Sequence, residues 1–109
     1  MQKKKKALVI GGSGFLGSHL ADELTLQGLD VVIYDQSSSP YLRPDQTFIS
    51  GSVLDLDQLL FASQGVNYIY NLAAIADIDE AKHKPKISAE TNIIGNINAL
   101  EVAKQQCVD

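Results

Sequence analysis

The fold of this chain is decided by residues 7–17, which read ALVIGGSGFLG. The four apolar residues 7–10 form a continuous run that ends at glycine, as in a strand buried on both faces of a parallel sheet. From Phe15 to Gln27 leucines recur every four positions, which predicts a helix with Gly28 as its C-terminal cap. The stretch therefore predicts a strand, a glycine turn and a helix.

The rest of the chain continues this alternation. We expect a second strand at Val31–Tyr34, a loop at Gln36–Pro44, a third strand at Thr47–Ser50, a helix capped by Asp55 and closed by Gly65, a fourth strand at Tyr68–Ala73 and a last helix from Ile87 to about Gln106. The pattern predicts an α/β fold with a doubly wound parallel sheet of strand order 3-2-1-4. The usual sheet of this type has about six strands, so we expect it to be incomplete on its C-terminal side.

Length and composition fit one small globular unit or a piece of a larger one. The chain has 109 residues, of which 45% are apolar and 20% charged, and this excludes a disordered or fibrous chain. The formal net charge is −4, and Arg43 is the only strong base between residues 7 and 81. A protein that binds a phosphate backbone needs clustered positive charge, so we expect no nucleic-acid partner.

The sequence predicts neither a membrane-spanning helix nor a location in an oxidising compartment. No stretch approaches the roughly 18 consecutive apolar residues of a membrane helix. Lysines 3–6 precede a short apolar run, as in a signal peptide, but glycines break that run, and we expect a solvated lead-in to the first strand. The single Cys107 can form neither an internal disulfide nor a cysteine-based zinc site, so we expect a cytoplasmic protein.

The glycine turn lies between a strand and a helix, where a dinucleotide phosphate site must be. Read from Gly12 its spacing is GxGxxG, and read from Gly11 it is GxxGxxG, so two registers stay open. The first glycine permits the tight turn, the second lets the backbone approach a pyrophosphate, and the third lets helix and sheet pack closely. Ser18 in place of lysine after Gly17 excludes a Walker loop. The alternative is a glycine-rich turn without a ligand.

Asp35 is the acidic residue that a dinucleotide site needs at the end of the second strand. It follows Gly17 by eighteen residues, and its carboxylate can accept both ribose hydroxyls while repelling a 2′-phosphate. This favours NAD over NADP. Arg43 is the one nearby base that leaves NADP open, and an aspartate that merely caps a turn is the alternative for Asp35 itself.

Four segments together resemble one family. Residues 10–17 resemble the GxxGFxG signature of extended short-chain dehydrogenase/reductases, the NAD-dependent epimerase/dehydratase family. Residues 51–55, GSVLD, are similar to its GDxxD, and residues 71–74, NLAA, to its HLAA. Pro85, Asn92, Gly95 and residues 100–103 are placed as in its PxxYxxxNxxGTxxLLEAA. The resemblance covers essentially the whole chain.

The resemblance implies a Rossmann-type fold that binds NAD. It assigns the cofactor-binding role to Gly11, Gly14, Phe15, Leu16 and Gly17 at the phosphates, to Asp35 and Gln36 at the adenosine ribose, to Ser52 and Val53 at the adenine, and to Leu72, Ala73, Ala74 and Asn92 at the nicotinamide end. The sequence departs from the family at four of these motif positions, with Ser52 for Asp, Asn71 for His, Ser88 for Tyr and Asn96 for Thr. The serine at position 52 weakens the expected side-chain hydrogen bond to adenine.

The family's catalytic pair, YxxxK, is absent from these residues. The residues four positions after Tyr34, Tyr41, Tyr68 and Tyr70 are Ser38, Asp45, Leu72 and Ala74. We therefore assign no catalytic residue, and no metal site either, because Asp77, Asp79 and Glu80 lack the spacing of a calcium loop. Residues 1–109 are expected to be the N-terminal part of a dinucleotide-binding domain, with the substrate domain absent.

Three functions stay open. The resemblance favours the NAD-binding segment of a nucleotide-sugar epimerase or dehydratase. The complete enzyme would transfer a hydride between the sugar and NAD by way of a keto-sugar intermediate and would be a homodimer. An NAD(P)-dependent dehydrogenase or reductase is the first alternative. A non-catalytic nucleotide-sensing module is the second, because the missing YxxxK would permit it.

Overall fold

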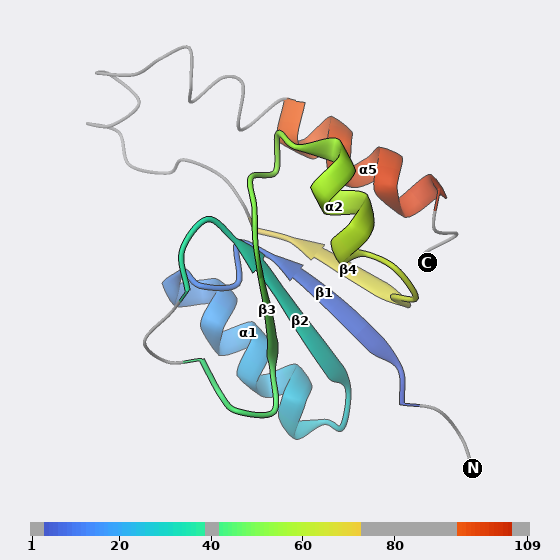
Figure 1. The fold of residues 1–109 in the computed structure, drawn as a ribbon. Coiled ribbons are helices and arrows are strands. Elements are labelled where there is room, and N and C mark those ends of the chain that lie inside the picture. The colour runs from blue at the N-terminus through green and yellow to red at the C-terminus, as the bar shows by residue number, and fades with distance from the viewer. Residues whose placement is uncertain (1–3, 39–41, 73–93, 106–109) are drawn as a thin grey trace.

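The computed structural model describes residues 4–38, 42–72 and 94–105, and in these it contains a four-stranded parallel sheet. The strands are β1 (Lys6–Ile10), β2 (Asp30–Asp35), β3 (Thr47–Ser50) and β4 (Tyr68–Asn71), in the order β3-β2-β1-β4 (Figure 1). The predicted order 3-2-1-4 is confirmed. Strand β4 ends at Asn71, two residues before the predicted end at Ala73, which lies outside the described residues.

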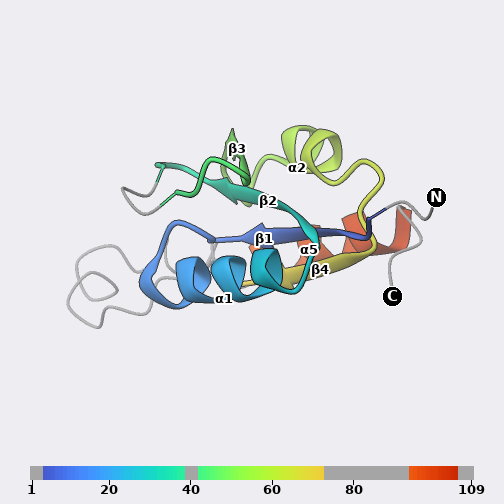
Figure 2. The same cartoon turned by 90° about the horizontal axis from the view of Figure 1, so that it is seen from below.

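Helices cover both faces of the sheet. Helix α1 (Phe15–Leu26) packs on one face, and α2 (Leu56–Ala62) and α5 (Gly95–Gln105) pack on the other (Figure 2). Strand β1 contributes side chains to the core on both faces of the sheet. Leu8 and Ile10 point toward α2 and α5, whereas Ala7 and Val9 point toward α1. All four are at most 1% exposed, as expected for a strand buried on both sides.

Two of the predicted helix ends, at Gly28 and Asp55, are confirmed, whereas α2 ends at Ala62 with Ser63 as its cap, before the predicted Gly65. The Asp55 carboxylate accepts the Gln58 N–H at 3.1 Å and so caps α2. Gly28 follows α1 with φ +93°, a left-handed conformation that favours glycine. The predicted first turns of the last helix, from Ile87, lie outside the described residues. None of the helices in the described ranges is long and apolar enough to cross a bilayer.

The register of the sheet aligns the carboxyl ends of its strands. Ile10 is paired with Tyr34 on one side and with Asn71 on the other, and Asp35 is paired with Ser50. The segments that follow β1, β2, β3 and β4 therefore start along one edge of the sheet. Open α/β sheets bind ligands at this edge.

Candidate functional site

The turn after β1 is shaped by Gly11 and tied to β2. Gly11 has φ +80°, which favours glycine, and its N–H donates to the Tyr34 carbonyl at 2.8 Å. The Gly14 N–H donates back to the Gly11 carbonyl at 3.3 Å. Because the positive φ falls on Gly11, the tight turn begins there and the GxxGxxG register applies.

Two more glycines of the turn are required by packing. A Cβ at Gly17 would overlap the Gly11 carbonyl oxygen and lie 2.8 Å from the Cα of Gly12. A Cβ at Gly12 would lie 2.7 Å from Cγ2 of Ile33 on β2. The contact between turn and sheet is thus made by Gly12, whereas Gly17 lets α1 pack on the turn itself. This corrects the expectation that the last glycine separates helix from sheet.

Gly14 has no such structural need. Its φ is −74°, which any residue adopts, and a Cβ there would meet only the Gly11 carbonyl oxygen, at 3.6 Å. Gly14 also caps α1 without any side-chain hydrogen bond, and the first turn of the helix carries no acidic residue. The space in front of this position is open to a ligand.

The start of α1 therefore presents backbone N–H groups that have no acceptor within the helix and no acidic side chain beside them in its first turn. The first N–H groups of a helix have no partner within it, and the helix dipole places partial positive charge there. Phe15 and Leu16 lie in this first turn with side chains that are 83% and 67% exposed. The predicted residues Gly11, Gly14, Phe15, Leu16 and Gly17 thus come together in one anion-binding geometry.

Asp35 lies beside the same turn, at the end of β2. Its Oδ2 accepts the Ser13 N–H at 3.1 Å, and its Oδ1 accepts the N–H of the exposed Gln36 at 2.7 Å. These bonds are the turn-capping role considered as an alternative. They use two of the roughly four lone-pair sites of a carboxylate, so both oxygens can still accept hydroxyl donors.

Ser13 was not singled out by the sequence. Its hydroxyl Oγ is buried and has no hydrogen-bond partner in the part of the chain that the structure describes. Buried polar groups are nearly always paired, and an exception calls for a ligand, a water or strain. This hydroxyl belongs to the turn that Asp35 holds in place, so it marks the turn as a place where a polar ligand would complete the structure.

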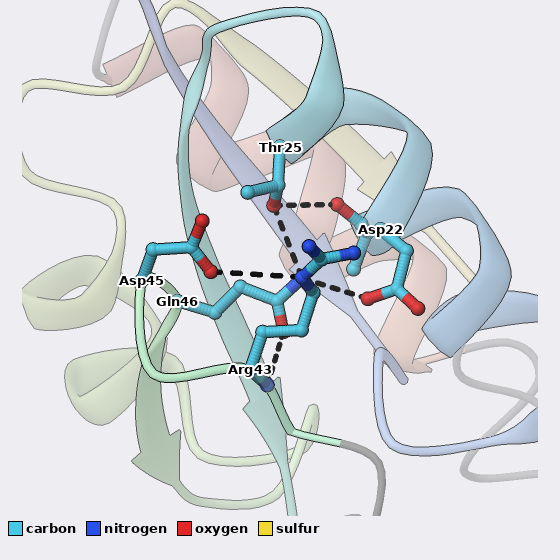
Figure 3. A network of polar contacts seen from close by, with 6 residues as sticks. Asp22, Thr25, Arg43, Asp45 and Gln46 are labelled. Atoms are coloured by element: carbon cyan, nitrogen blue, oxygen red, sulfur yellow. Dashed lines mark hydrogen bonds and ion pairs between the residues drawn. The ribbon is translucent and has the colours of Figure 1, made fainter.

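Arg43 lies elsewhere. The backbone N–H of Arg43 donates to Oε1 of Gln46 at 3.1 Å. The side-chain Nε of Arg43 is 3.7 Å from the Asp45 carboxylate. The buried Gln46 in turn donates to Asp22 and Thr25 of α1, each at 3.0 Å (Figure 3). These two helix residues lie seven and ten positions after Phe15, about 10 to 15 Å along the axis. The backbone of Arg43 is therefore tied through Gln46 to the body of α1, and its side chain pairs with Asp45.

The turn after β3 is fixed by Tyr34. The phenol hydroxyl of Tyr34 donates to the Ser52 carbonyl at 2.7 Å, and burial, with a smaller contribution from the Asp55 charge, raises its pKa to about 12. The Ser52 Oγ accepts the Leu54 N–H at 3.1 Å, so this hydroxyl already serves the turn. Ser52 lies partly exposed near the carboxyl end of β2.

Val53 follows with its side chain in the core. It is 6% exposed and packs against Gly95 of α5, and its carbonyl accepts the Asn98 side-chain N–H at 3.0 Å. A ligand in front of this turn would therefore meet the backbone of Val53 and not its side chain.

The end of β4 closes the site on the other side. The Leu72 N–H donates to the Ile10 carbonyl at 2.8 Å, which places Leu72 directly beside the glycine turn. The side-chain amide of Asn71 donates to Oδ1 of Asn96 at 2.6 Å, so two of the departures from the family pattern contact each other. They tie the start of α5 to β4. Ala73, Ala74 and Asn92 lie outside the described residues.

No cluster of three or more metal-ligating side chains occurs within residues 4–38, 42–72 and 94–105. Asp77, Asp79 and Glu80 are outside these ranges.

Sequence comparisons agree with this geometry. The model of the NAD dependent epimerase/dehydratase family matches residues 7–109. The UDP-N-acetyl-alpha-D-glucosaminuronate decarboxylase of Bacillus cytotoxicus is 35% identical over 106 residues, which are 92% of this chain and 33% of that protein.

Two solved structures share the fold. The UDP-glucose 4-epimerase of Thermotoga maritima, solved with UDP-glucose, has a TM-score of 0.87 and 33% identity over 94% of this chain and 35% of that one. The Thermus thermophilus UDP-glucose 4-epimerase, solved with NAD, has a TM-score of 0.87 and 27% identity over 95% of this chain and 35% of that one. The chain spans about a third of the length of these relatives, and by the match over residues 7–109 it belongs to the NAD-dependent epimerase/dehydratase family.

Proposed function

We propose that this chain is the NAD-binding segment of an enzyme that epimerises or dehydrates a nucleotide-sugar. The observation that carries the proposal is the start of α1 at the glycine turn, where the cap residue Gly14 makes no side-chain hydrogen bond and the Asp35 carboxylate lies beside the turn. A chain with a net charge of −4 can bind a diphosphate through such backbone N–H groups. The Thermus thermophilus relative, which was solved with NAD, supports the choice of ligand.

The residues of the site fit this cofactor in parts. The N–H groups at the start of α1 would hold the pyrophosphate, with Gly14 leaving room for it. Asp35 would accept the ribose hydroxyls next to Gln36, and the turn at Ser52 and Val53 would face the adenine. Leu72, Ala73, Ala74 and Asn92 would lie toward the nicotinamide. The Ser13 hydroxyl, which has no partner among the described residues, offers one more polar group to the ligand.

NAD supplies a hydride acceptor when it is bound. The residues described here bind and orient, and none of them moves a proton. Tyr34 is buried, with its phenol donating to the Ser52 carbonyl and its pKa raised to about 12, so it cannot act as a base at neutral pH. The proposal therefore places proton transfer and sugar binding in a further part of the enzyme, beyond an N-terminal half-domain made of residues 1–109.

The same proposal includes a nucleotide-sugar substrate, a homodimer and a cytoplasmic location. The nucleotide-sugar is supported by relatives such as the Thermotoga maritima enzyme, solved with UDP-glucose. The homodimer is supported by exposed apolar side chains at and just before α5, where Ile94, Ile97 and Leu100 are 45%, 57% and 72% exposed. Such exposed apolar side chains favour burial against another chain.

A titration of the ¹⁵N-labelled chain with NAD⁺, followed by two-dimensional NMR, tests the proposal. The amide resonances of Phe15, Leu16, Gly17 and Asp35 should shift together and saturate. Glu101 and Lys104, at the far end of α5, are internal controls and should not move. Absence of saturable shifts in the turn, or shifts confined to α5, would contradict the proposed function.

A further inference from the structure

Tyr34 occupies an unusual place for a polar side chain. It is the second-to-last residue of β2, is 1% exposed, and belongs to the core cluster that α2 and α5 cover. Its neighbour Asp35 points to the candidate site at the sheet edge, as the bond from the Ser13 N–H indicates. The Tyr34 hydroxyl reaches instead beneath the turn after β3, where it donates to the Ser52 carbonyl at 2.7 Å.

Gly51 makes this reach possible. A Cβ at Gly51 would overlap the Tyr34 hydroxyl and lie 2.6 Å from Cζ of its ring. The Ser52 carbonyl also accepts the Asp55 N–H at 3.0 Å, so a phenol and a backbone amide hold it from two sides. The peptide that joins Ser52 to Val53 is thereby fixed in orientation.

This orientation decides where the Val53 N–H points. In a planar trans peptide the carbonyl of one residue and the N–H of the next point in opposite directions. Since the Ser52 carbonyl faces Tyr34 in the core, the Val53 N–H faces away from Tyr34. It has no acceptor within the described part of the chain, although the Leu54 and Asp55 N–H groups on the same turn are both paired.

We infer that Tyr34 is a positioning residue for adenine recognition: it aims the Val53 N–H at the acceptor nitrogen N1 of the adenine ring. The inference rests on the proposed function and adds the residue that orients the turn at Ser52 and Val53 toward the base. The Ser52 hydroxyl accepts the Leu54 N–H, which uses one of its two lone pairs, whereas the Val53 N–H is a donor whose direction Tyr34 fixes. The adenine N1 is an acceptor, whereas N1 of hypoxanthine carries a hydrogen at neutral pH and cannot accept.

The test compares NAD⁺ with its hypoxanthine analogue in calorimetric titrations of the wild-type chain and of Tyr34→Phe. The wild type should bind NAD⁺ more tightly than the analogue. Tyr34→Phe should weaken NAD⁺ binding about three- to tenfold, the effect of one hydrogen bond, and leave the analogue unchanged. Tyr70→Phe on β4 removes the same atom outside this turn and should change neither affinity.

Three other outcomes would overturn the inference, and one of them would also overturn the proposed function. An equal loss for both dinucleotides in Tyr34→Phe would mean a merely structural role and would overturn the inference. A wild type that binds both dinucleotides equally would overturn it without any variant. A wild type that binds neither overturns the proposed function, and the inference with it.

Discussion

Replacing Gly17 by alanine should lower the stability of the chain, whereas replacing Gly14 by alanine should lower its affinity for NAD⁺. The Cβ of Gly17→Ala would overlap the Gly11 carbonyl and lie 2.8 Å from the Gly12 Cα, against about 3.5 to 4.0 Å for an ordinary carbon contact. Backbone atoms must move by about 1 Å to relieve this. We expect Gly17→Ala to lower the free energy of unfolding by about 1 to 3 kcal/mol, the usual cost of overpacking.

Gly14→Ala should instead leave stability nearly unchanged. Its Cβ meets only the Gly11 carbonyl oxygen, at 3.6 Å, and φ is −74°. Alanine is a poorer N-cap than glycine, but it also loses less backbone entropy on folding, and the two effects offset each other to within about 1 kcal/mol. The methyl group would stand where we place the pyrophosphate, so NAD⁺ affinity should fall about tenfold or more, at least about 1.4 kcal/mol.

Urea unfolding followed by circular dichroism measures the first quantity, and calorimetric titration with NAD⁺ measures the second. Wild-type affinity in Gly14→Ala would refute the placement of the phosphates. Wild-type stability in Gly17→Ala would refute the packing argument for the turn.

Three further predictions concern titration, turnover and association. The Tyr34 phenol has a pKa of about 12 in the folded chain and near 10 when unfolded, so the free energy of unfolding should fall by up to about 2 to 3 kcal/mol as the pH rises from 10 to 12. Tyr34→Phe should lack this decrease. Equal urea-unfolding curves of the wild type across pH 9 to 12 would contradict the prediction. Residues 1–109 should turn over no nucleotide-sugar, since no tyrosine has the lysine four residues on that would make it a base, and measurable epimerisation in a coupled assay would refute this. The 109-residue chain should self-associate through β4, which ends the sheet in the described residues, and a monodisperse monomer by light scattering at high concentration would contradict this.

The strands and helices were predictable because their signals are local. Four consecutive apolar residues at 7–10 demand burial on both faces, and Gly28 and Asp55 end or start helices through bonds to residues within one turn. Strand order then followed from the rule that parallel strands connect through crossovers. The turn, Asp35 and Ser52 were predictable as a group because all lie at or just after the carboxyl ends of strands in one parallel sheet.

What escaped prediction depends on contacts between distant residues. Spacing alone could not tell which glycine takes the positive φ; it is Gly11, whose N–H also bonds to Tyr34 on the neighbouring strand β2. The position of Arg43 depends on Gln46, which bonds to α1 more than twenty residues earlier in the chain. The reach of Tyr34 to Ser52 depends on an absent side chain at Gly51, and no periodicity reports it.

Calorimetric titration of the 109-residue chain with NAD⁺ and NADP⁺ decides whether this chain binds NAD through the α1 turn and Asp35. We predict tighter binding of NAD⁺, because the Asp35 carboxylate accepts ribose hydroxyls and repels a 2′-phosphate, while the Arg43 side chain pairs with Asp45. Replacing Asp35 by glycine should narrow the preference by about 1 to 3 kcal/mol. Equal affinity of the unmodified chain for both cofactors, or binding of neither, would contradict this prediction.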